Sequence, residues 1–105
     1  MHKILAALIV LFALPAYAGE VLVLATATRV DPGPLSSRKG LEIQNNGPAL
    51  ISCQVRTSTG LTTSKGRLVQ PGEAWTVGAN TNTPVYCIAA SPQVTGAATF
   101  VTEVP

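Results

Sequence analysis

Apolar and polar residues alternate with a period of two along much of the chain after residue 18, which is the spacing of half-buried β-strands. In "GLEIQN" (40–45), Leu41 and Ile43 would face a core, while the residue after each of them would face solvent. No stretch after residue 18 has apolar residues at helical spacing, and Thr, Val and Ile are frequent. The pattern therefore predicts an all-β domain.

Turn-forming residues divide this pattern into short segments. Pro71 and Gly72 suit the central pair of a type II turn, because proline fixes φ and glycine accepts a positive φ. The "NNGP" sequence (45–48) is expected to close a hairpin between the strands on either side of it. The predicted strands are 20–30, 40–45, 49–57, a short strand within 58–66, both halves of 67–77, and a last pair at 85–90 and 97–104. Seven to eight short strands predict a small antiparallel β-sandwich, of jelly-roll or Ig-like type.

The first 18 residues have the layout of a secretory signal peptide. A short basic head is followed by an unbroken apolar run over residues 4–14, then by Pro15 and the small residues Ala16 and Ala18 around Tyr17. The run is shorter than the ~20 residues that a membrane-spanning helix needs. We expect cleavage after Ala18, leaving 19–105 as a single β-sandwich domain; the alternative is an uncleaved leader that anchors the domain to a membrane.

Export bears on the two cysteines, Cys53 and Cys87, which lie 34 residues apart in strand-like segments. An oxidising compartment favours a disulfide over a redox or metal site, and alternation turns both sulfurs toward the apolar side. A bridge closing a loop of this length stabilises by about 3 to 4 kcal/mol in the chain-entropy model. Two buried free thiols are the alternative.

Charge and composition exclude several function classes for the mature chain. Six cationic side chains stand against five acidic ones in residues 19–105, so nothing favours binding to nucleic acid or to an acidic membrane. The sole histidine, His2, leaves with the leader, which removes imidazole from any nucleophile pair or metal site. The acids are scattered and are expected at the surface, and Arg38-Lys39 is expected to be a solvated turn. We predict no enzyme activity, no catalytic residue, no cofactor and no metal.

Four residues are candidates for contact with a partner: Trp75, Tyr86, Asn80 and Asn82. Trp75 shares a face with Val77, which favours burial in the core over stacking on a ligand. Tyr86 lies on the opposite face from Cys87 and is expected to be partly exposed. Asn80 and Asn82 belong to a polar loop, "GANTNTP" (78–84), of the kind that carries recognition in sandwich folds.

Three segments between residues 38 and 90 together resemble a small β-sandwich module of bacteriophage and prophage virion proteins. The module reads as an Arg-x-x-Leu-x-Ile-Gln-Asn hairpin, a Gly-x-x-Leu-x-Pro-Gly-Glu turn and a Tyr-x-Ile-x-Ala strand. The matching residues here are Arg38, Leu41, Ile43, Gln44 and Asn45, then Gly66, Leu68, Pro71, Gly72 and Glu73 with one extra residue before the proline, then Tyr86, Ile88 and Ala90.

The resemblance implies a structural or adhesive virion part, such as a capsid decoration, spike or fibre knob, present in multiple copies beside other virion proteins. The module normally lacks a leader and a cysteine pair, so an exported version suggests a virus that collects its parts at the host membrane, or a host protein with the same fold. The leading hypothesis is a non-enzymatic virion structural or surface protein, minor coat components included, whose partners are other virion proteins or the host surface. The alternative is a bacterial secreted or periplasmic binding module for a carbohydrate or protein ligand.

Overall fold

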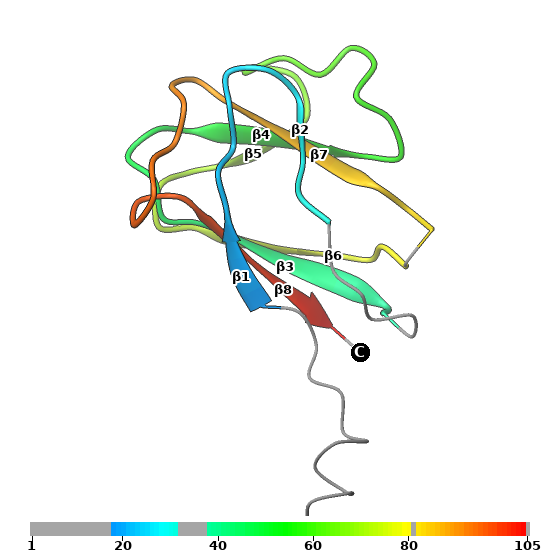
Figure 1. Cartoon of the computed structure of the whole chain (residues 1–105). Coiled ribbons are helices and arrows are strands. Elements are labelled where there is room, and N and C mark those ends of the chain that lie inside the picture. Colours follow the sequence, from blue (N-terminus) through cyan, green and yellow to red (C-terminus); the bar gives the residue numbers. More distant parts are fainter. Residues whose placement is uncertain (1–17, 32–37, 81, 105) are drawn as a thin grey trace, which may run out of the picture.

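The computed structural model describes residues 18–31, 38–80 and 82–104. They form two four-stranded antiparallel sheets that pack face to face (Figure 1), which confirms the predicted β-sandwich. Sheet A has the strand order β1-β8-β3-β6, and sheet B has the order β2-β7-β4-β5. The strands are β1 (Ala18–Val21), β2 (Thr28–Arg29), β3 (Gly40–Asn45), β4 (Ile51–Val55), β5 (Arg67–Val69), β6 (Ala74–Val77), β7 (Val85–Ala89) and β8 (Thr99–Val104).

The core lies between the sheets and follows the alternation of the sequence. Leu41 and Ile43 of β3 are fully buried, whereas Glu42 between them is exposed. The same alternation in β7 buries Val85 and Cys87 and leaves Tyr86 half-exposed. The buried cluster comprises Val23, Val30, Leu41, Ile43, Ile51, Cys53, Val69, Ala79, Val85, Cys87, Ala89 and Val101. Removing this apolar surface from water is the main force that holds the two sheets together.

The connections between strands differ from those that the sequence pattern suggested. Among the described strands, β4 and β5 are the one pair of sequence neighbours that hydrogen-bond to each other; every other neighbour pair is divided between the sheets. The predicted hairpin across 45–48 is therefore wrong, because β3 pairs with β6 and β8 while β4 pairs with β5 and β7. The predicted last pair is wrong for the same reason, since β7 and β8 lie in different sheets. An alternating pattern shows that a strand has a buried face but does not say which sheet it joins.

The strand expected over 20–30 is two strands in two sheets. β1 pairs with β8 of sheet A, and β2 pairs with β7 of sheet B. The hydroxyl of Thr28 accepts a hydrogen bond from Leu24 N at 3.0 Å and donates one to Thr26 O at 2.9 Å, which holds the bend between them. These local bonds compete with a continuous ladder.

The connection from β4 to β5 folds over the outer side of sheet B. The expected short strand within 58–66 is absent from this described segment, which has only an isolated bridge between Thr62 and Lys65. Leu61 is buried, and Gly66 has φ +127°. A Cβ at Gly66 would lie 2.6 Å from Ser52 Oγ and 2.8 Å from Cys53 O, so only glycine lets the chain pass this close to β4.

The turn between β5 and β6 agrees with its prediction. Glu73 N donates to Gln70 O at 2.9 Å, and Gly72 has φ +83°, as a type II turn requires. The predicted signal peptide lies outside the described residues except for Ala18, the first residue of β1, which pairs with Thr102. Cleavage after Ala18 would remove only that one residue of the sandwich.

Candidate functional site

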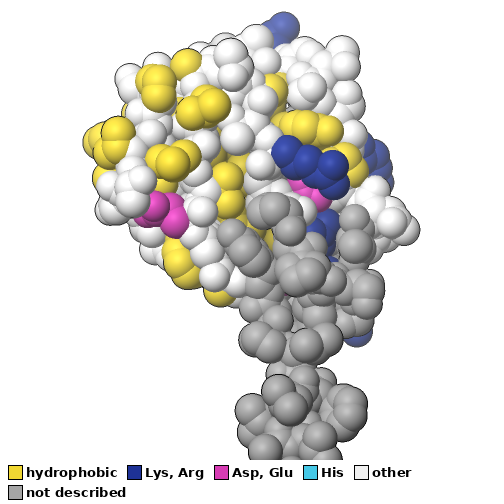
Figure 2. Space-filling model, viewed as in Figure 1, with side chains coloured by type: hydrophobic (Ala, Val, Ile, Leu, Met, Phe, Trp, Pro, Cys, Tyr) yellow, Lys and Arg dark blue, Asp and Glu magenta, His cyan; other side chains and the backbone are white. Residues whose placement is uncertain are grey.

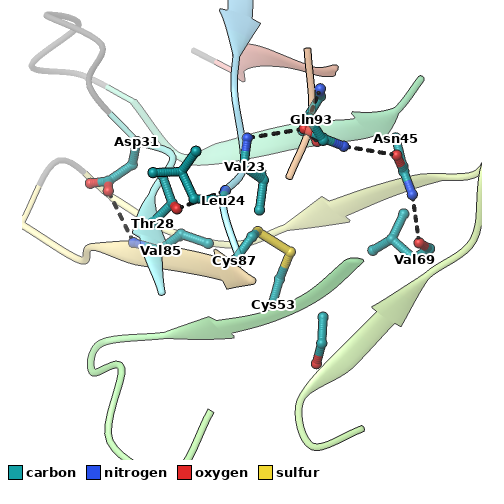
Figure 3. Close-up of a disulfide and its surroundings, with 12 residues drawn as sticks. Val23, Leu24, Thr28, Asp31, Asn45, Cys53, Val69, Val85, Cys87 and Gln93 are labelled. Carbon is teal, nitrogen blue, oxygen red and sulfur yellow. Dashed lines mark hydrogen bonds between the residues drawn. A yellow bond between two sulfur atoms is a disulfide. The ribbon is translucent and has the colours of Figure 1, made fainter. Parts of the chain in front are cut away.

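The predicted disulfide is present and joins Cys53 of β4 to Cys87 of β7 (Figure 3). The two residues stand directly opposite each other in sheet B, with a Cα–Cα distance of 4.1 Å. Both are buried in the apolar cluster, as the alternation of their strands predicted. The bridge therefore locks the register of β4 against β7 within one sheet, and it leaves no free thiol in the described chain.

A buried guanidinium occupies one end of the sandwich. Arg38, just before β3, is 2% exposed, which contradicts the expected solvated turn; only its neighbour Lys39 is exposed. Its side chain donates to three carbonyl oxygens of the β6–β7 connection, on Ala79 at 2.8 Å, on Asn80 and on Thr83 at 3.1 Å. Three carbonyls that converge on one point need a side chain that only donates, and arginine carries five N–H groups.

Two buried carboxylates complete this end of the molecule. Asp31 and Glu103 each lie 3.7 Å from Arg38 nitrogens and are almost fully buried, so the expectation that the acids lie at the surface is wrong for both. Asp31 also accepts a hydrogen bond from Val85 N at 3.1 Å (Figure 3). We call Asp31, Arg38 and Glu103 the ionic end.

Arg29 of β2 closes the ionic end from the solvent side. It makes a bidentate contact with Asp31, at 2.8 and 3.1 Å, although its own side chain is 56% exposed. The hydrogen bonds and charge of Asp31 raise the pKa of Arg29 above its ordinary value, so the guanidinium stays charged throughout the accessible pH range. Asp31 thus has a cation on each side.

A neutral network of amide side chains occupies the opposite end of β3. Gln93 Oε1 accepts from Val23 N, Thr99 N and Thr99 Oγ1, each at 3.0 Å, and Gln93 Nε2 donates to Asn45 Oδ1 at 3.2 Å (Figure 3). Asn45 also accepts from Gly47 N at 3.0 Å and donates to Ala49 O and Val69 O. We call Asn45, Gln93 and Thr99 the amide end.

Sequence reasoning missed both polar ends as structural sites. Asn45 is predicted as a strand end, a turn residue and a motif position but not as a buried hydrogen-bonding group, and nothing in the sequence pattern points to Gln93. The one local signal is the "QNNGP" turn (44–48), in which an Asn side chain bonding to the amide two residues ahead is common. Gln93 is bonded to Val23 and Thr99, which lie in other elements, so the sequence around Gln93 does not indicate these contacts.

The four candidate contact residues do not form one site. Trp75 is half-buried on the inner side of sheet A, opposite Ile43, and its ring lies 5.9 Å from the guanidinium carbon of Arg67. Tyr86 is on the outer side of sheet B, beside Arg29 in the ladder, and is partly exposed as predicted. Burial of Trp75 against the core agrees with the favoured interpretation of its pattern.

Asn80 and Asn82 lie together, and exposed, in the β6–β7 connection. The Asn80 side chain accepts from Asn82 N at 2.9 Å and from Thr83 Oγ1 at 3.0 Å, so it shapes the loop above the ionic end. A role in partner contact stays a prediction for all four residues.

Three further results concern metal binding, membrane spans and similar proteins. Residues 18–31, 38–80 and 82–104 contain no group of three or more His, Cys, Asp or Glu that could hold a metal ion. Among these same residues, no helix is both long enough and apolar enough to span a membrane. Comparisons with family models, with curated proteins and with solved structures found no match.

Proposed function

We propose that the chain is a non-enzymatic structural or surface component of a virion, exported across the inner membrane and held together by one disulfide. It would act in multiple copies, through its shape and its contacts with other virion proteins or the host surface. The protein would then be located in virion particles, or in the extracellular or periplasmic space.

The observation that carries the proposal is how the reactive side chains of the described chain are used. Both cysteines form the buried bridge, and the buried charges of the ionic end contact one another and the backbone. These groups therefore serve the scaffold, and the surface is left to make contacts. A buried disulfide is also compatible with an oxidising compartment outside the cytosol.

The virion part of the proposal rests on the resemblance of residues 38–90 to the phage module. Several motif positions have a definite place in this fold: Arg38 belongs to the ionic end, Asn45 to the amide end, and Gly66 and Gly72 have positive φ. These residues determine turns and sheet crossings, so the resemblance concerns the scaffold more than any contact surface.

Proteomics of purified extracellular particles tests the proposal directly. We expect the chain at a constant copy number per particle, beginning at Gly19, with two hydrogens fewer than the reduced mass. The soluble periplasmic fraction, processed in the same way, is the control. A chain found only in that fraction would rule out the virion role and favour the secreted binding module.

One feature favours that alternative strongly enough to test. Arg29 and Tyr86 are neighbours on the outer side of sheet B, and a charged guanidinium beside a partly exposed phenol ring can bind a sugar or a protein surface. Binding of the mature protein to a glycan array, lost in Tyr86→Ala and kept in Trp75→Phe, would establish a carbohydrate ligand at this position.

A further inference from the structure

Four strands in the described sandwich lie at sheet edges, and one of them lacks a charge. β1 contains Glu20, β2 contains Arg29 and β5 contains Arg67. β6, with the sequence Ala-Trp-Thr-Val, has no charged residue and no proline of its own. The nearest charges are Glu73, directly before it, and Arg67 of β5, whose guanidinium carbon lies 5.9 Å from the Trp75 ring. Natural sheets protect their edges with charges, prolines or bulges, because an exposed row of backbone groups pairs with other chains. β6 is therefore the one edge strand of the described sandwich without a charge inside the strand itself.

The alternation of hydrogen bonds along β3 shows which backbone groups of β6 point away from β3, toward the free edge of sheet A. Asn45 N donates to Glu73 O at 3.0 Å, and Asn46 N donates to Ala98 O at 3.1 Å. Because bonded pairs alternate in an antiparallel ladder, the odd-numbered residues of β3 bond toward β6 and the even-numbered ones toward β8. Trp75, opposite Ile43, therefore uses its backbone N–H and C=O to bond to β3 within the sheet. The N–H and C=O of Ala74 and Thr76 point to the free edge.

These outward groups have the spacing to pair with a second copy of the same strand. In an antiparallel arrangement about a two-fold axis, Ala74 stands opposite Thr76 of the second copy, and Thr76 stands opposite its Ala74. Trp75 then faces Trp75 of the second copy in the central, closely spaced position, which would cover the exposed part of each half-buried ring. Ala74 and Thr76 are small and uncharged, so their side chains do not hinder the joining of sheet A of one copy to sheet A of the other.

We propose that β6 is a self-association edge, which joins two copies of this chain through a β6–β6 ladder into one continuous sheet. The inference goes beyond the proposed function and holds for the isolated mature protein, whichever role that protein has. Arg67 covers each Trp75 from the sheet B side. A ladder of four residues buries less than the ~1,200 Å² of a standard interface, so the association is expected to be weak and reversible.

A second surface offers the competing explanation for any dimer. Leu22, Leu24 and Val94 are 40%, 47% and 63% exposed, and apolar side chains gather where the 22–27 segment lies against the β7–β8 connection (Figure 2). Nothing in the structure shows what covers this patch. It therefore serves as the comparison surface in the test.

The test is sedimentation velocity on mature protein (19–105, oxidised) from micromolar to about millimolar concentration. We expect reversible dimerisation that weakens about ten-fold or more in Thr76→Pro, which removes an outward donor from each copy but no bond to β3. Thr76→Lys should also weaken it, because the two residues at this position lie diagonally across the axis on the same side of the joined sheet and would bring two cations near each other. The controls are Thr102→Lys, a matched change on the same side of sheet A but on β8, beyond β3, and Leu24→Lys in the apolar patch. Both should dimerise as the unchanged protein does, and a circular dichroism melt verifies that each variant is folded.

Amide hydrogen exchange identifies the edge independently of any variant. The amides of Ala74 and Thr76 should gain protection as concentration rises, while Val77, which bonds to β3, stays protected throughout. A protein that remains monomeric at every concentration would overturn the proposal. So would a dimer whose Thr76 amide exchanges freely, or one abolished by Leu24→Lys and kept in Thr76→Lys.

Discussion

The two ends of the sandwich are both polar and buried, yet they are built from different chemistry. At the ionic end, three carbonyl oxygens of the β6–β7 connection converge, and a guanidinium donates to all of them. At the amide end, N–H groups of Val23, Gly47 and Thr99 need acceptors, while carbonyls of Ala49 and Val69 need donors. Asn and Gln both donate and accept, so they suit this mixed demand, whereas Arg suits a demand for donors alone.

The comparison teaches why so small a domain buries polar side chains at all. Nearly every connection crosses from one sheet to the other, and crossing chains bring backbone groups into the ends of the sandwich that no ladder can satisfy. Each end supplies those partners from side chains. The ionic end additionally brings two carboxylates near the cation, which makes it costly to break, whereas the amide end carries no net charge.

The largest effect is expected from removing the central cation of the ionic end. Arg38→Met should lower the free energy of unfolding by about 3 to 5 kcal/mol, because two carboxylates and three carbonyls would remain buried without it. Urea denaturation followed by circular dichroism at pH 7 measures the change. Lys39→Met, at the exposed neighbour, is the matched control and should stay within about 0.5 kcal/mol. A loss below about 1 kcal/mol for Arg38→Met would show that the ionic end does not stabilise the fold. If Arg38→Met does not fold, Arg38→Lys, which keeps the charge but not the fork of donors, still allows the measurement.

The disulfide, which lies between the two ends (Figure 3), should rank next. The double change Cys53→Ala and Cys87→Ala is expected to lower the free energy of unfolding by about 3 to 4 kcal/mol, because the unfolded chain gains conformational entropy without the bridge. The same urea titration measures it. Alkylation of the unchanged exported protein under denaturing, non-reducing conditions should label no thiol. Labelling of both cysteines would show that the bridge does not form in the cell.

The amide end should show a smaller loss. Gln93→Leu leaves the amides of Val23 and Thr99 without their shared acceptor and should lower the free energy of unfolding by about 2 to 3 kcal/mol. The same urea titration at pH 7 measures the change. A loss below about 0.5 kcal/mol would show that Gln93 does not stabilise the amide end.

The smallest effect is expected from Arg29, whose side chain is mostly exposed. Arg29→Ala should lower stability by at most about 1 kcal/mol, and less at high salt, because Asp31 keeps its bonds to Val85 N and its pair with Arg38. Because Asp31 raises the pKa of Arg29 in the folded protein, the contribution of this pair to stability is fully present below the pKa of the unfolded chain, which already lies above the accessible range, so no pH effect is expected there. Thermal melts at low and high salt measure the change. A loss equal to that of Arg38→Met would show that the exposed and buried cations are equivalent.

Local features were predictable where local physics decides them. The β3 strand was predicted with its observed bounds, because alternation over 40–45 is unbroken. The turn at 70–73 followed from the conformational limits of Pro71 and Gly72, and the disulfide followed from a predicted signal peptide and two inward positions. Each of these predictions uses only the residues concerned or a property of the compartment.

The errors have one physical origin. Strand pairing was wrong at 45–48 and at the last pair, because the same alternation serves a hairpin and a crossing between sheets. The burial of Arg38 was missed because its partners come from other elements: Asp31 lies seven residues before it, and Ala79, Asn80, Thr83 and Glu103 lie more than 40 residues after it. A charged residue is usually solvated, and only the assembled ends of the sandwich supply enough acceptors to change that.

The sequence by itself determined an all-β domain with its apolar faces, one cysteine pair and the Pro71-Gly72 turn, since these depend on side-chain period and backbone sterics. The tertiary structure alone decided which sheet each strand joins, and therefore which polar groups are buried together at each end. It also placed β6, which has no charge within the strand, at the edge of sheet A. Pairing and burial are properties of surfaces made by distant segments, and no single segment contains them.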